Sequence, residues 1–121
     1  MKSERPSIFL PERAPLGVTF LVFPGSSIMC VASAIDPLRA ANRVAGETMF
    51  DYALVSVGGQ PPVTTSGMPV AVSGAFDPAR PTDMLAVIGG FGTRYAADRR
   101  LVSGIRKVAR SARAVGGIEA G

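Results

Sequence analysis

The chain has 121 residues, of which 47% are hydrophobic and 18% are charged, so it forms at most one globular domain and is too apolar to be disordered. Its net charge of +4 divides into +5 over residues 98–113 and −1 over the remainder, which confines the basic character to one segment. The chain contains no histidine, and this excludes a Ser-His-Asp or Cys-His catalytic site built from this chain alone. No apolar run reaches the roughly 20 residues that cross a bilayer. Because the single cysteine, Cys30, can form no internal disulfide, we expect a cytoplasmic protein.

The first predicted elements follow a flexible arm at residues 1–16, which is rich in proline and mixed in charge. Residues 17–23 are apolar at nearly every position, which indicates a strand covered on both faces, as in a parallel sheet. A helix is expected to begin at Ser26 and Ser27 and to end at Gly46, because its apolar residues recur every three to four positions.

The interior of this first helix contains Pro37, which we expect to kink or restart it, with Asp36 as a candidate cap. The polar residues Arg39, Asn42 and Arg43 are expected to face outward.

The middle of the chain predicts a second strand over residues 50–57 and a third over residues 83–88. Between them, residues 63–65 and 68–72 flank a Ser-Gly turn and predict two short antiparallel strands, a hairpin appended to the main sheet.

The last part of the chain predicts a basic amphipathic helix over residues 98–113 and a final strand over residues 115–118. Strand–helix–strand, hairpin, strand–helix–strand is the pattern of a doubly wound α/β fold. The basic side chains oppose the apolar stripe of the helix, so a solvated outer face accounts for them, and phosphate binding is the alternative.

Two stretches after predicted strands are candidate binding sites. Gly89, Gly90, Phe91 and Gly92 offer bare backbone N–H groups that suit an anion, although their spacing differs from dinucleotide motifs and a tight turn would look the same. Glu119 ends the last strand among small residues, at the sheet edge where α/β proteins bind ligands. The alternative for Glu119 is an exposed chain end, and no second acid or base lies nearby in sequence.

Cys30 lies near the start of the first helix, where a helix N-terminus can activate a thiol. Its apolar neighbours favour the alternative, a small core residue.

Several of these stretches together resemble a known family. They resemble the amidotransferase-like N-terminal domain of AraC-type transcription regulators, which belongs to the PfpI-type branch of the class I glutamine amidotransferase-like superfamily. The resemblance covers about residues 17–121, and its most specific part is the run Ala-Ile-Asp-Pro-Leu-Arg-Ala-Ala-Asn-Arg at residues 34–43. The other matching stretches are residues 20–27, 66–67, 83–90 and 116–121. The resemblance implies a flavodoxin-like, mainly parallel sheet with an appended β-hairpin.

The resemblance also assigns roles to single residues. Enzymes of the superfamily carry a nucleophilic cysteine in a Gly-x-Cys-x-Gly elbow, which residues 117–121 match with Glu119 in place of the cysteine. Relatives carry an acidic residue on the first helix, at a position that Cys30 occupies here. The two residue types are thus exchanged, which implies a pocket without hydrolytic activity, lined by Glu119, Cys30, the start of the first helix (Ser26 and Ser27) and residues 89–92.

The function that the resemblance implies is a non-catalytic sensing and dimerisation domain for a small cationic or amino-acid-like nitrogen metabolite, without a cofactor, a metal or a membrane. In the family the domain continues past the elbow, and a C-terminal helix-turn-helix domain binds DNA, so residues 17–121 are expected to be the first portion of an incomplete domain. One alternative is a PfpI-type amidase, protease-like or glyoxalase-like enzyme that uses Cys30 as a displaced thiol. The other is a direct nucleic-acid binder that uses the helix over residues 98–113.

Overall fold

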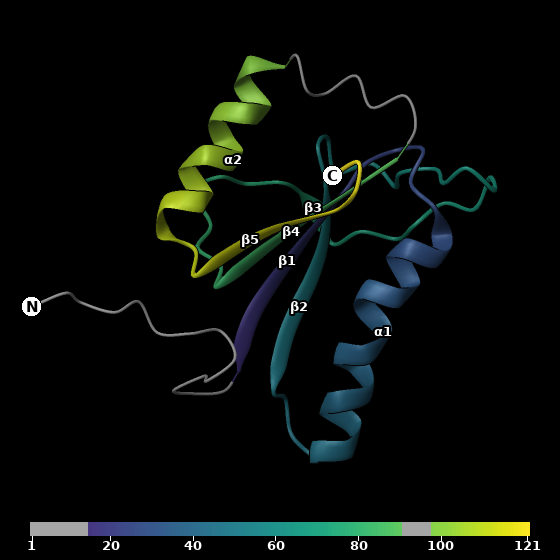
Figure 1. Ribbon diagram of the computed structural model, residues 1–121, viewed down its shortest axis with the longest axis vertical. Coiled ribbons are helices and arrows are strands. Elements are labelled where there is room, and N and C mark those ends of the chain that lie inside the picture. Colours follow the sequence, from purple (N-terminus) through teal and green to yellow (C-terminus); the bar gives the residue numbers. More distant parts are fainter. Residues whose placement is uncertain (1–14, 91–97) are drawn as a thin grey trace, which may run out of the picture.

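The computed structural model describes residues 15–90 and 98–121, which form a parallel sheet flanked by two helices (Figure 1). The sheet has the strand order β3-β2-β1-β4-β5, and every pairing in it is parallel. The elements are, in chain order, β1 (Leu16–Val22), α1 (Ile28–Ala45), β2 (Phe50–Ser56), β3 (Gly74–Ala75), β4 (Met84–Gly89), α2 (Arg99–Ser111) and β5 (Ala114–Glu119). The α/β fold class expected from the sequence is confirmed.

The two helices lie on opposite faces of the sheet (Figure 1). From β1 the chain passes through α1 to β2 on one side, and from β4 it passes through α2 to β5 on the other side. The strand order therefore reverses between β1 and β4, which is the topological switch point of a doubly wound sheet.

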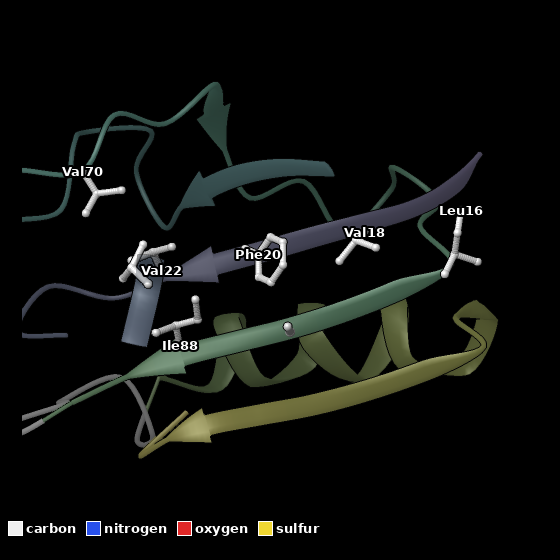
Figure 2. Packing of buried hydrophobic residues seen from close by; sticks show 8 residues of the cluster. Leu16, Val18, Phe20, Val22, Val70 and Ile88 are labelled. Carbon is white, nitrogen blue, oxygen red and sulfur yellow. The ribbon is translucent and has the colours of Figure 1, made fainter. Parts of the chain in front are cut away.

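The core has two halves, because alternate side chains of each strand point to opposite faces of the sheet. On the α1 side, Leu16, Val18, Phe20 and Val22 of β1 pack with Ile88 and with residues of α1. Figure 2 shows these side chains along one side of β1, with Val70 of the β2–β3 connection near the end of the strand. On the α2 side a second cluster contains Leu21, Phe23, Val55, Leu85, Val87, Leu101, Val108 and Ala112.

The helix ends follow local sequence signals. Asp98 caps α2, and its carboxylate accepts hydrogen bonds from the N–H groups of Arg100 and Leu101 at 3.0 and 3.1 Å. Gly46 ends α1 in the left-handed region with φ of 70°, as predicted.

The interior of α1 differs from the prediction. Pro37 lies inside one helix that continues from Ile28 to Ala45, so the helix is not restarted there. Asp36 is not a cap: it forms an exposed ion pair with Arg39, 2.7 Å between Nε and Oδ1, and this hydrogen bond holds the pKa of Asp36 below its usual value.

Asn42 does not face solvent as predicted. Its Oδ1 accepts hydrogen bonds from the N–H groups of Met49 and Phe50, and its Nδ2 donates to the carbonyl of Phe50, all at 2.9 Å. Sequence periodicity alone misses this role, because the partners lie beyond the end of the helix.

The expected hairpin is reduced to one antiparallel bridge between Val63 and Pro69. Pro69 has no N–H to extend a ladder, and the Thr64 hydroxyl donates to the Met68 carbonyl at 2.8 Å. The turn attaches to the β1–α1 connection through the N–H of Thr65, which donates to the Ser26 carbonyl at 3.0 Å. The short strand β3 was not predicted.

Neither helix in the described part of the chain is long and apolar enough to span a membrane.

Candidate functional site

The candidate site lies at the carboxyl edge of the sheet, where β1, β4 and β5 all end. This edge contains the switch point between β1 and β4, and α/β proteins bind ligands in the crevice at such points. Of the predicted site residues, Ser26 and Ser27 follow β1, Gly89 ends β4 with Gly90 directly after it, and Glu119 ends β5. Phe91 and Gly92, which were also predicted, lie outside the described residues.

The turn after β1 is tied to β4 by Ser26. This residue is fully buried, and its Oγ donates to the carbonyl of Phe23 at 2.6 Å and to that of Ile88 at 3.2 Å. Its hydroxyl therefore fixes the turn. Ser27 is half-buried at the N-cap of α1, and its side chain forms no capping hydrogen bond.

The end of β4 requires glycine, because backbone approaches it from two sides. A Cβ on Gly90 would collide with the carbonyl oxygen of Gly25 and lie 3.0 Å from Cα of Ser26. A Cβ on Gly89 would lie 2.9 Å from the backbone of Ala120 and of Gly121. The diglycine thus holds the turn after β1 and the turn after β5 against β4.

The turn after β5 places Glu119 in an unusual backbone conformation. Its φ is 59°, and it is the one non-glycine residue with positive φ among residues 15–90 and 98–121. The left-handed region costs a residue with a Cβ about 1–2 kcal/mol. The N–H of Gly121 closes the turn on the Ile118 carbonyl at 3.1 Å. The turn presents the Glu119 side chain to solvent, opposite Gly89 in the β4–β5 register.

Cys30 lies in the first turn of α1, is half-buried, and packs against the core cluster on the α1 side. It lines an open depression of about 330 Å³ together with Met29, Ser33, Ala34 and Ile118. Cys30 therefore shares this depression with Ile118, the residue before Glu119. Glu119 itself does not line the depression.

Met29 and Ile118 are part of this site and were not predicted from the sequence. Met29 is 75% exposed at the start of α1, in a helix whose other large apolar residues mostly pack against the sheet. A signal for Met29 existed in the sequence, because it is a large apolar residue outside the apolar periodicity that Ile28 and Val31 begin.

The comparisons with known proteins identify relatives, although no family model matches the chain. The chain is 37% identical over 102 residues to the HTH-type transcriptional regulator CdhR of Pseudomonas aeruginosa, and the aligned region is 84% of this chain and 30% of CdhR. Other curated relatives are also HTH-type transcriptional regulators. The chain spans roughly a third of the length of the curated relatives it matches.

Solved structures share the fold. An AraC family transcriptional regulator from Pseudomonas putida matches with a TM-score of 0.68 and 24% identity, over 85% of this chain and 64% of that one. A DJ-1 superfamily protein from Agrobacterium tumefaciens matches with a TM-score of 0.59 and 16% identity, over 84% of this chain and 52% of that one. The homologues of this chain are thus AraC/GlxA-type transcriptional regulators, and its fold is that of the amidotransferase-like, DJ-1/PfpI-type domain of such regulators.

Proposed function

We propose that this chain is the ligand-sensing part of an AraC-type transcription regulator, that it has no catalytic activity, and that it works as a homodimer. The relatives support this proposal, since they are named as regulators and imply DNA binding through a separate domain. The proposed ligand is a small metabolite with an ammonium or guanidinium group.

The observation that carries the proposal is the conformation of Glu119. A strained, exposed residue at a tight turn after a strand is the geometry by which α/β enzymes present a nucleophile. Here the side chain presented is a carboxylate, a poor substitute for a thiolate in amide chemistry, and the chain has no histidine to assist it. A carboxylate at this point is suited to pairing with a cation.

The surroundings of Glu119 fit an amine with a hydrocarbon body. The depression next to it is lined by Met29, Cys30, Ala34 and Ile118, which offer apolar contact to a short alkyl chain. In this proposal Ser27 contributes its hydroxyl to the ligand. The backbone around Ser26, Gly89 and Gly90 holds the turns beside the proposed site in place.

The proposed signal is a shift between two arrangements of a dimer. The ligand would contact the start of α1 and the end of β5, two elements on different sides of the switch point. A ligand that binds one arrangement more tightly than the other shifts the population toward it, and a DNA-binding domain can respond to that shift.

The test is binding of a panel of amino acids and betaines, including L-arginine and glycine betaine, measured by isothermal titration calorimetry. For each ligand that binds the wild type, Glu119→Gln should weaken binding about 10- to 150-fold, the effect of losing one hydrogen bond to a charged group. The matched control is Glu47→Gln, which makes the same change at an exposed position in the turn between α1 and β2. If Glu119→Gln binds as tightly as the wild type, or both variants lose affinity equally, the proposed site is wrong.

A further inference from the structure

The outer face of α2 carries five cations and no anion. We call this set the basic face: Arg99, Arg100, Arg106, Lys107 and Arg110, all of them exposed. At 3.6 residues per turn they fall within an arc of about 120°, opposite the buried residues Leu101, Val108 and Ala112. The arc also contains Ser103, which is exposed and uncharged.

No counter-ion neutralises the basic face within the part of the chain that the structure describes. None of its five side chains has an ion pair or hydrogen bond to residues 15–90 or 98–121. The neighbouring Asp98 is engaged through its carboxylate by backbone N–H groups at the start of the helix. On α1, by contrast, Arg39 is paired with Asp36.

Some of these cations are placed where they destabilise the helix that carries them. Arg99 and Arg100 lie in its first turn, where the helix dipole is positive and disfavours cations. Arg106 and Arg110 are like charges four residues apart, which repel each other on a helix surface. Arg110 also lies in the last turn, where the helix dipole favours a cation. Helix stability gives no reason for Arg99 and Arg100 in the first turn, and binding of an external polyanion does.

We propose that the basic face binds the phosphate backbone of DNA, as a contact additional to that of a separate DNA-binding domain. From Arg99 to Arg110 the helix rises roughly 16 Å, a length of duplex axis along which each DNA strand carries about five phosphates, at about 3.4 Å of axial rise per phosphate. Such a contact is independent of base sequence and would add affinity beside the specific site.

The composition of the basic face favours DNA over an acidic protein. A stable protein interface has an apolar or aromatic centre within a polar rim. The arc of the basic face contains only the five cations and Ser103, with no apolar side chain to form such a centre. A phosphate backbone requires positive charge and nothing more.

The test is a salt titration of binding to a labelled 20-base-pair duplex of arbitrary sequence, followed by fluorescence anisotropy between 50 and 200 mM salt. With five phosphate contacts, the plot of log affinity against log salt should have a slope of about −4 to −5. Arg106→Gln/Arg110→Gln should reduce the steepness of this slope by about 2. The matched control is Arg39→Gln/Arg43→Gln on α1, which removes the same charge from another i, i+4 pair and should leave the slope unchanged. Thermal unfolding of each variant verifies that the fold is retained.

Three results would overturn this proposal. The first is no DNA binding at 50 mM salt and micromolar to near-millimolar protein, the usual range of non-specific affinities. The second is an equal loss of slope in both double variants, which would reflect net charge alone. The third is poly-L-glutamate binding as tightly as DNA with the same dependence on Arg106 and Arg110, which would assign the face to an acidic protein. None of these results bears on Glu119, so the sensing proposal is tested separately.

Discussion

The sheet is held together by different means at its amino edge, where the parallel strands begin, and at its carboxyl edge, where they end. At the amino edge, side chains satisfy the backbone: Asp83 accepts from the N–H of Gly17 at 2.8 Å, and Thr82 donates to the carbonyl of Met84 at 3.0 Å. At the carboxyl edge, one buried side chain, Ser26, has a similar role, but the glycine backbones of Gly89 and Gly90 also pack directly against neighbouring turns.

This difference distinguishes the end of the sheet that supports the fold from the end that contains the candidate site. Asp83 and Thr82 at the amino edge are committed to hydrogen bonds that hold the beginnings of the strands in place. At the carboxyl edge the absence of side chains at Gly89 and Gly90 lets the turns after β1 and β5 approach the end of β4, and Glu119 is left exposed in a strained conformation. The contrast can be tested by substitutions at each edge.

The largest effect is expected from Gly90→Ala. The added Cβ would meet the backbone of Gly25 and Ser26, which cannot move aside as a flexible side chain would. We expect the free energy of unfolding to fall by about 3 kcal/mol or more, measured by urea denaturation. The control is Gly58→Ala, where no atom lies within 4 Å of the added Cβ. Equal stability of the two variants would show that the carboxyl edge is not close-packed as described.

A smaller effect is expected from Asp83→Ala at the amino edge. The change leaves the N–H of Gly17 without its acceptor, so the free energy of unfolding should fall by about 1–3 kcal/mol. The response of the folded protein to ligand should stay unchanged, because Asp83 lies at the opposite end of the sheet from Glu119. Asp51→Ala, at an exposed carboxylate of β2, is the control and should have little effect. A variant that keeps its stability but loses the ligand response would contradict the division between the edges.

The sequence predicted the strands and helices of the main sheet because their physical signals are local. Strands β1 and β4 are buried on both faces and apolar at almost every position, and α2 has a clear apolar stripe. The predicted boundaries differ from the observed ones by one or two residues.

The features that were missed depend on partners outside the predicted element that contains each residue. Asn42 binds the chain after the helix, Val63 and Pro69 form one bridge where two strands were expected, and β3 exists only because β2 offers an open edge. At the candidate site, the sequence indicated which residues lie at the carboxyl edge. Their close approach could not be predicted, because it depends on which backbone each glycine meets.

The most direct test of the account is Glu119→Gly, measured by urea unfolding with and without a ligand that binds the wild type. Glycine relieves the strain of a positive φ, so the variant without ligand should be as stable as the wild type or more stable by up to about 1 kcal/mol. It should also lose the added stability that the ligand gives the wild type. This result would show that Glu119 lowers the stability of the folded chain without ligand and is needed for binding the ligand. A variant that is destabilised by more than about 1 kcal/mol, or that still responds fully to the ligand, would contradict the central claim.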